Sequence, residues 1–415
     1  MHLEFTYGGR ILPLDVDDRR VLAVLSPGQV PALGETEILS SALRRPVASK
    51  PFEAFCSDGE DVLFIVNDAT RPSPLERILD VLSPSPIIMN AAFLVATGTH
   101  PAPDEADLRL LFGRHLDAHR ERIAVHDAKN ESDMVTAGTT RFGTAVRFNR
   151  RVTDARKLVV VGTVEPHYFA GFTGGRKAFL PGCAAYATVE SNHRFALDPG
   201  SSTCALEGNP VHEDMQSAAD LLSDKSVFSI QNVLDENGRI VAAFAGDLET
   251  SFRKAVEAST RVFCVPVPKS AGIVVGMVAP PLDSDLYQAH KALENAKPAV
   301  KRGGVFILTA ACGRGTGNDA FIRLLSSEKR PEDVLRKIEK GYRLGYHKSA
   351  RIAEFATHSQ CWAVTDLDPQ VLRSAFIRPF DSLQAAVDAA VEQKPDAKIL
   401  IIRSAGTVVP RIRGE

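Results

Sequence analysis

The chain alternates short runs of β-branched residues with amphipathic segments over nearly its whole length. Such runs are typical of strands, and amphipathic segments between them are typical of helices that cover a parallel sheet. The segments 61–68, 91–100, 121–128 and 156–167 are expected to be strands that run into loops, and the expected helices between them are 72–82 and 103–116. The sequence therefore predicts an α/β fold with Rossmann-like parallel sheets.

Two such series of strands and helices follow one another. A chain of 415 residues is too long for one ordinary hydrophobic core, which favours two domains. Residues 227–246 read as two strands joined by a turn, and a second series begins at 271–278, so the break lies near 262–270. We expect a first domain at 1–266 and a second α/β domain at 267–415, whose last segment could return to the first. A ligand is expected in an active-site cleft between the two domains.

Composition and charge limit the class of partner. The formal net charge is -2, with 44% hydrophobic and 24% charged residues, which gives no field that would recruit nucleic acid or an anionic membrane. No apolar run has the length of a signal peptide at the start or of a membrane span later, and the six cysteines form no CxxC pair. The sequence predicts a cytoplasmic protein that acts on a small molecule, without a nucleic-acid or membrane partner.

Three expected strands end in reactive side chains. Ligands of open α/β sheets bind beyond the carboxyl ends of the strands. One strand is followed by Asp68 and Arg71, another by Thr99 and His100, and a third by His167. Each of these alone is more often structural, for example as a helix cap. Two histidines, which change charge near neutral pH, among converging strand ends favour a catalytic site.

The segment AGFTGGRKAFLPG at 170–182 places Gly174 and Gly175 just before Lys177. Glycines allow a backbone to approach a ligand closely, so the segment invites comparison with a phosphate-binding loop. A Walker A loop requires glycine directly before its lysine and serine or threonine after it. Arg176 and Ala178 stand there instead, which excludes the nucleotide-triphosphate interpretation.

The second domain contains two weaker patterns. Gln288 and Lys291 lie three residues apart on one face of a helix expected to begin near Asp285, and taken by themselves they are better explained as part of a solvated helix face. The loop CGRGTGN at 312–318 follows a strand, but Asn318 replaces the last glycine of the dinucleotide fingerprint. A plain turn is the alternative there, and a nicotinamide-dependent 2-hydroxy acid dehydrogenase would require the complete fingerprint.

Several segments, taken together and in this order, resemble the nickel-dependent lactate racemase family: NDATRP, ATGTH, VEPHYFAGFTGGRKAFLPG, SNHRFAL, LEGNPVHEDM and LYQAHKA. The resemblance extends from about residue 7 to the C-terminal strand, and the EPH…GGRK…H block is its most specific part. It implies an isomerase that inverts C2 of a small 2-hydroxy acid with a nickel-pincer nucleotide. It also implies proteins that make this cofactor as partners, and it leaves a homo-oligomer open.

The resemblance carries roles over to individual residues. Lys177 matches the lysine that joins the cofactor covalently, and His193 matches the histidine that is the protein's ligand to nickel. His100 and His167 match a pair of acid/base histidines. The matches for residues that orient the substrate or the histidines are Asp68 and Arg71 in the first domain and Gln288 and Lys291 in the second. The further cofactor contacts carried over are Thr99, Gly174 and Gly175.

The chemistry of a 2-hydroxy acid fits these roles. Removal of the C2 proton next to a carboxylate would leave an almost unstabilised carbanion, whereas removal of a hydride leaves a planar 2-keto acid. A histidine takes the hydroxyl proton in the same step, and return of the hydride to the opposite face inverts the centre. Two histidines on opposite sides of the substrate would serve its two configurations.

The substrate side chain and two alternative functions stay open in the sequence. A basic residue often follows the GTH motif in the lactate-specific members of the family, but Pro101 and Ala102 follow His100 here. Lactate, malate, longer or aromatic 2-hydroxy acids and sugar acids all remain candidates. The alternatives to a racemase or epimerase are the dehydrogenase and a non-catalytic homologue that binds a nucleotide or an acid.

Overall fold

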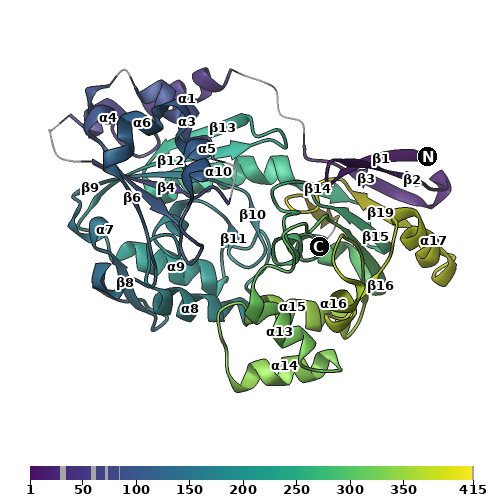
Figure 1. The fold of residues 1–415 in the computed structure, drawn as a ribbon. Helices are drawn as coiled ribbons and strands as arrows, with labels where there is room; N and C mark the ends of the chain where they lie inside the picture. The colour runs from purple at the N-terminus through teal and green to yellow at the C-terminus, as the bar shows by residue number, and fades with distance from the viewer. Residues whose placement is uncertain (29–33, 58–61, 71–72, 84, 414–415) are drawn as a thin grey trace. The chain divides into compact units, whose positions relative to one another are not determined.

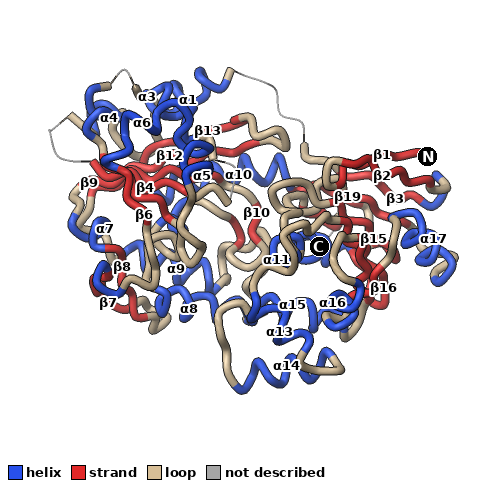
Figure 2. Tube along the Cα trace, in the orientation of Figure 1, coloured by secondary structure: helices blue, strands red, loops and turns tan. Residues whose placement is uncertain are grey.

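The computed structural model describes residues 1–28, 34–57, 62–70, 73–83 and 85–413 (Figure 1). Its contacts divide the chain into two compact units, one made of Met1–Gly28 with Phe263–Glu415 and the other of Gln29–Val262. Each unit is built on a six-stranded sheet with helices packed on it, as Figure 2 shows in red and blue. The predicted α/β class with parallel sheets is confirmed.

The sheet of the 29–262 unit is parallel except for one edge strand. Its strand order is β13-β12-β9-β4-β5-β6, and β13 runs antiparallel to β12. The strands are β4 (Val62–Asn67), β5 (Ala92–Ala96), β6 (Ile123–Val125), β9 (Lys157–Thr163), β12 (Ser226–Leu234) and β13 (Ile240–Gly246). All residues of β9 are buried, as expected for a parallel strand that is covered on both faces.

Helices cover both faces of this sheet. On one face, α1 (Glu35–Arg44), α3 (Leu75–Leu82) and α5 (Glu105–Phe112) bury apolar side chains against the strands in one core. Figure 1 shows α8 (Tyr186–Arg194) and α9 (Pro210–Asp220) on the opposite side. The strands that lead into the site loops are thus anchored in the core that they share with α1, α3 and α5.

The second unit has a sheet in which all strands are parallel. Its strand order is β18-β17-β16-β15-β19-β3. The strands are β3 (Val21–Leu25), β15 (Ala271–Met277), β16 (Val300–Thr309), β17 (Gln360–Val364), β18 (Ile377–Pro379) and β19 (Ile399–Ile402). One face packs against α12 (Lys291–Ala296), α13 (Asp319–Ser326) and α15 (Tyr346–Ala356). The other packs against α17 (Leu383–Gln393) and the hairpin of β1 (His2–Tyr7) and β2 (Arg10–Asp15).

The expected domain limits of 1–266 and 267–415 are wrong for the start of the chain. Residues 1–28 belong to the unit that contains 263–415, because β3 is the edge strand beside β19, with Val24 opposite Ile401. The suggested return of the last segment to the first domain is also wrong, since β19 and β20 (Val409–Ile412) pair with strands of their own unit. The division itself falls between Val262 and Phe263, within the expected break at 262–270.

Two other features bear on the sequence analysis. The hairpin expected at 227–246 is formed by β12 and β13 and is confirmed. The helix expected to begin near Asp285 is formed as two short helices, α11 (Leu286–Ala289) and α12, and β16 follows at Val300. Among the described residues, no helix combines the length and the apolar character needed to cross a membrane.

Candidate active site

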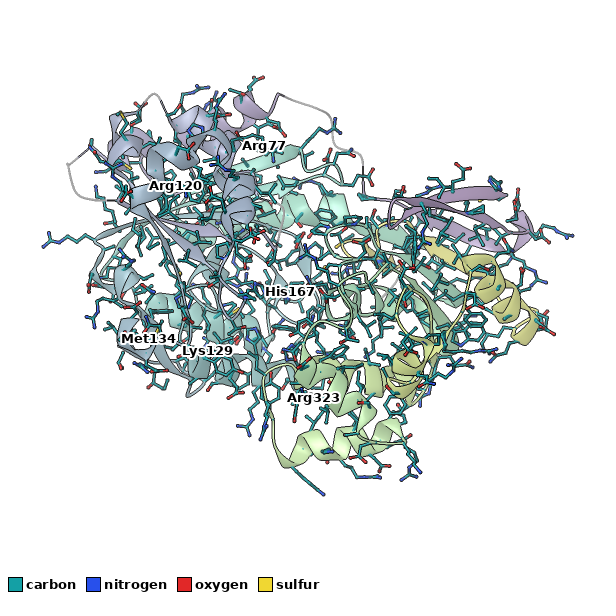
Figure 3. The ribbon with its side chains drawn as sticks, viewed as in Figure 1. Arg77, Arg120, Lys129, Met134, His167 and Arg323 are labelled. Atoms are coloured by element: carbon teal, nitrogen blue, oxygen red, sulfur yellow. The ribbon has the colours of Figure 1, made fainter. Side chains whose placement is uncertain are left out.

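The candidate site of the 29–262 unit lies at the carboxyl ends of three neighbouring parallel strands. β4 hydrogen-bonds to β5 on one side and to β9 on the other, and Asn67 at the end of β4 pairs with Ala96 at the end of β5. Parallel strands end at the same edge of a sheet, so the loops that carry Asp68, His100 and His167 leave from one edge. His167, labelled in Figure 3, lies on the short strand β10 (Pro166–His167) that follows β9.

His100 and Asp68 form a close pair. Nδ1 of His100 lies 2.6 Å from Oδ2 of Asp68, whose side chain is only 8% exposed, whereas that of His100 is 41% exposed. The other carboxylate oxygen of Asp68 accepts a 2.6 Å hydrogen bond from the hydroxyl of Thr70. An ionised carboxylate only accepts, so Nδ1 of His100 carries a proton and Nε2 presents its lone pair when the ring is neutral. The pair orients His100 for proton transfer at Nε2.

His167 has the opposite hydrogen-bonding arrangement. It is buried on β10, which pairs with β11 (Gly171–Phe172). The backbone N–H of Ala170 donates to Nδ1 of His167 over 3.3 Å, so the neutral ring carries its proton on Nε2. The two histidines are thus held in different tautomers, one with a lone pair and the other with a proton on Nε2.

The ring of Phe169 contacts three of the residues singled out in the sequence. Its centroid lies 4.6 Å from that of His167 and 5.0 Å from that of His193, and Nζ of Lys177 lies 5.7 Å from it. His167 comes from β10, Lys177 from the 3-10 helix Gly175–Ala178 and His193 from the last turn of α8. The structure thus brings an amine and two imidazoles around one aromatic ring.

Arg176, which precedes Lys177, is buried and braces the lysine loop. Its Nη2 donates to the carbonyl oxygen of Ala170 over 2.7 Å, and its Nη1 donates to that of Gly174 over 3.2 Å. The guanidinium lies 4.4 Å from the ring centroid of Phe252, and burial lowers the pKa of Arg176 to about 9. The sequence analysis used Arg176 only to reject a phosphate loop, and no sequence signal marks a buried arginine of this kind.

The glycines of this loop pack against protein. Gly174 and Gly175 have backbone φ angles of +82° and +54°, which residues other than glycine rarely adopt. An added Cβ would lie 2.5 Å from Oε1 of Gln231 at Gly174 and 2.8 Å from the ring of Phe252 at Gly175. Close approach to a ligand was the expected reason for these glycines, whereas the observed one is close packing on β12 and α10 (Leu248–Phe263).

Thr99 and His100 line a cavity of about 410 Å³ in the same unit. Pro101 and Ala102, the pair that departs from the lactate-specific pattern, line it too. Nζ of Lys129, also at this cavity and labelled in Figure 3, lies 5.6 Å from the ring of Tyr186. The cavity therefore offers apolar, hydroxyl and cationic groups beside His100.

The residues predicted in the second domain lie in the other unit. Gln288 lies in the short helix α11 (Leu286–Ala289), which Asp285 caps, and Lys291 begins α12. Both are partly exposed, whereas Ala289 and His290 between them are buried. That the two side chains share one face, as their spacing suggests, stays a prediction. Arg71, expected to hold a substrate carboxylate, lies outside the described residues.

The CGRGTGN loop supports this segment. Backbone hydrogen bonds of 2.7 to 3.2 Å join residues 312–316 to 283–287, which lead into α11 and include its first two residues. Asn318, which replaced the last glycine of the fingerprint, accepts a hydrogen bond from the N–H of Phe321 and caps α13. The loop is thus a turn that holds its neighbour, which agrees with the plain-turn alternative.

His193 is the residue that the sequence analysis expected to bind a metal. Among the described residues, no group of three or more histidine, cysteine, aspartate or glutamate side chains could hold a metal ion. A single imidazole binds a divalent ion weakly, so the imidazole of His193 by itself is not a strong metal site.

Two family models match the chain. "Lactate racemase N-terminal domain" matches residues 7–204, and "Lactate racemase C-terminal domain" matches residues 267–409. The lactate racemase of Thermoanaerobacterium thermosaccharolyticum is 33% identical over 346 residues, which cover 81% of this chain and 80% of that protein. The lactate racemase of Lactiplantibacillus plantarum is 29% identical and covers 96% of this chain and 97% of that protein.

Solved structures show the same fold. The lactate racemase apoprotein from T. thermosaccharolyticum matches with a TM-score of 0.90 at 30% identity, over 99% of this chain and 100% of that one. A protein from Thermotoga maritima matches with a TM-score of 0.71 at 16% identity, over 93% of this chain and 100% of that one. The second likeness concerns the fold alone.

Proposed function

Since the chain belongs to the lactate racemase family and is therefore an isomerase, we propose that it interconverts the two configurations at C2 of a small 2-hydroxy acid. The observation that carries this proposal is the grouping of His167, Lys177 and His193 around Phe169, with the His100–Asp68 pair following the next strands of the sheet. Membership of an isomerase family argues against the alternative function of a dehydrogenase. The other alternative, a non-catalytic binding protein, would not need two oriented histidines.

Lys177 and His193 are suited to hold a nickel-pincer nucleotide. A lysine amine can form a covalent bond to the cofactor, and a neutral imidazole is a good ligand for nickel. Both side chains contact Phe169, so one bound group could reach both. When bound, this cofactor would supply the nickel centre and the acceptor for the C2 hydride. Thr99, Gly174 and Gly175 remain proposed contacts to it.

Proton transfer falls to the two histidines. Nε2 of His100 presents a lone pair and accepts the proton of the C2 hydroxyl, while Asp68 stabilises the imidazolium that forms. Nε2 of His167 carries a proton and donates a hydrogen bond to the C2 oxygen. Full proton exchange at His167 requires that Nδ1 give up the hydrogen bond from Ala170, which is long at 3.3 Å and easily broken.

Substrate binding needs positive charge for the carboxylate. Arg71 is proposed to bind it with two parallel hydrogen bonds, and Gln288 and Lys291 of the other unit are proposed as further substrate-binding residues. Lactate is the substrate that both relatives' names state, so it is the first candidate here. The cavity of about 410 Å³ beside His100 makes longer 2-hydroxy acids the second.

The test uses protein from a host that makes the cofactor. We expect a covalent mass increment, nickel bound to the chain, and inversion of one or more acids in a panel of lactate, malate, longer, aromatic and sugar 2-hydroxy acids. Protein carrying increment and nickel that inverts none of these acids would contradict the proposal. Protein from a host without the cofactor pathway is the matched negative control.

A further inference from the structure

We propose that Asn192 and Asp214 are positioning residues that hold His193 in the tautomer whose Nε2 lone pair is free of a proton and can bind a metal. Neither residue was predicted from the sequence to take part in the site. The proposal rests on the proposed function, in which His193 is the nickel ligand. It is carried by a chain of hydrogen bonds from Asp214 on α9 through Asn192 to His193 on α8.

The amide of Asn192 can be oriented from its partners. Asn192 is fully buried, and its Nδ2 donates to Oδ2 of Asp214 over 2.8 Å and to the backbone oxygen of Val211 over 3.2 Å. Both partners are acceptors, so the NH₂ group must face them and Oδ1 must face the other way. Oδ1 lies 3.2 Å from Nδ1 of His193. That ring nitrogen must therefore carry the proton, which leaves Nε2 as the acceptor and metal ligand.

Asp214 is itself held as an acceptor. It is fully buried, and the hydroxyls of Thr140 and Thr144 donate to its two oxygens over 2.6 and 3.0 Å. The Thr140 hydroxyl oxygen already accepts hydrogen bonds from the backbone N–H groups of Phe142 and Thr144, so its own proton has to point to Asp214. Thr140 therefore fixes which group donates and which accepts in the whole series of hydrogen bonds from Asp214 through Asn192 to His193.

The arrangement matches what metal-binding histidines require. A ligand histidine usually donates its second ring N–H to a carboxylate or carbonyl oxygen, which fixes the tautomer and raises the basicity of the ligating nitrogen. Here an amide oxygen takes that place and a buried carboxylate polarises the amide from behind. His193 is partly exposed, so this hydrogen bond restrains a ring that its surroundings enclose only in part.

Asp214→Asn tests the proposal with little change in shape. The new amide oxygen should stay at Oδ1, because the Thr140 hydroxyl must donate there, and this places the new NH₂ group against the NH₂ of Asn192. Two donors cannot face each other, so we expect the Asn192 amide to turn, to give up its 3.2 Å hydrogen bond to the Val211 oxygen, and to present its NH₂ to Nδ1 of His193. The proton of the ring should then move to Nε2. Thr144→Val is the matched control. It removes one donor to the same carboxylate but leaves the donor and acceptor roles of Asp214, Asn192 and His193 unchanged.

The first measurement is the protonation pattern of the ring nitrogens by ¹⁵N NMR, in histidine-labelled protein without cofactor and at a pH where imidazoles are neutral. The signal that His193→Gln removes identifies His193. We expect the Nδ1–H form in the unaltered chain and in Thr144→Val, and the Nε2–H form in Asp214→Asn. An Nε2–H form in the unaltered chain, or no change in a folded Asp214→Asn, would overturn the proposal. If Asp214→Asn does not fold, Asn192→Ala should instead give a mixture of both forms.

The second measurement is nickel retained per chain after a chelator challenge, in protein from a cofactor-producing host. Loss of such a supporting residue typically costs ten- to a hundredfold in metal affinity, so Asp214→Asn should lose nickel at least about tenfold more readily than Thr144→Val. Equal retention in these two, with loss in His193→Ala, would overturn the positioning role. If His193→Ala retains nickel, the ligand assignment in the proposed function fails, and the ring-nitrogen pattern alone decides whether Asn192 and Asp214 position His193.

Discussion

Oδ1 of Asp68 accepts a hydrogen bond from the Thr70 hydroxyl while Oδ2 lies 2.6 Å from Nδ1 of His100, so both oxygens of one carboxylate are engaged. In Asp68→Asn, the amide oxygen should remain with Thr70 and the NH₂ should face His100, which would force its proton to Nε2. We expect kcat to fall on the order of a hundredfold to ten-thousandfold, with covalent increment and nickel retained.

The control for this variant is Asp80→Asn. It breaks another His–Asp contact of 2.6 Å, between Asp80 on α3 and His115, away from the strand ends. Chiral chromatography of the product would measure both variants. Equal kcat for Asp68→Asn and Asp80→Asn would show that the carboxylate of Asp68 has no role in proton transfer.

Lys177 and His193 should have separable functions. Lys177→Ala is expected to abolish the covalent mass increment and the activity, because no amine remains at the loop. His193→Ala is expected to lose nickel and keep the lysine available. Intact mass and metal analysis measure both effects. The control is Lys254→Ala, which removes an exposed lysine of α10 and should keep the mass increment and the metal. An increment that persists in Lys177→Ala would refute the attachment site.

His100 and His167 should act on opposite configurations of the substrate. With cofactor-loaded protein and C2-deuterated acids, His100→Ala and His167→Ala should show opposite enantiomer preferences in isotope exchange. Each should lose net inversion by about a hundredfold to ten-thousandfold, the usual effect of losing a general base. Near-normal racemisation by both variants would return these histidines to a structural role.

His212 should make folding sensitive to acid. Burial, with a smaller effect of the Arg176 charge, lowers its pKa from 6.5 to about 3, so the folded state keeps the ring neutral. Between pH 6.5 and 3 the unfolded chain takes up a proton that the folded chain does not. Stability from this group is therefore present above pH 6.5 and lost as pH falls, by up to about 1.4 kcal/mol per unit. Urea unfolding of His212→Leu should show a shallower loss, and parallel pH curves would contradict this.

Gly174 should not tolerate a side chain. Gly174→Ala would place a Cβ 2.5 Å from Gln231 in a left-handed backbone, and we expect it to lower both the free energy of unfolding and the yield of modified Lys177. Gly143→Ala is the matched control: its φ of +84° is similar, but nothing lies within 4 Å of the new Cβ. It should cost only the left-handed strain of about 1–2 kcal/mol. Equal melting temperatures would contradict a packing role for Gly174.

The sequence predicted the strand ends well because strand periodicity and loop chemistry coincide there. Asp68 and His100 could be placed together since β4 and β5 are consecutive buried strands, which commonly pair in parallel. The contacts of Phe169, Asn192 and Asp214 could not be predicted. They arise where β10, α8 and α9 approach one another, and a phenylalanine or a buried amide has no sequence signature of its own.

The assignment of residues 1–28 shows a different limit. β3 has the composition of any other strand in the chain, and only its pairing with β19 reveals to which sheet it belongs. Local pattern identifies a strand but carries no information about a partner that lies far away in sequence. The burial of Arg176 could not be predicted for the same reason. It depends on hydrogen bonds from the guanidinium to the backbone oxygens of Ala170 and Gly174, which only the folded loop brings into place.

Residues 29–262 are inserted between the two parts of the other unit. The ribosome therefore begins with the unit that contains residues 1–28 but completes the inserted unit first. The inserted unit can fold once residue 262 has emerged. β3, made much earlier, has to wait for β19 at Ile399–Ile402 before its hydrogen-bonding edge is covered. For most of translation the nascent chain thus carries an apolar strand without its neighbour in the sheet. Nascent chains with such an unpaired strand edge are the kind that chaperones bind.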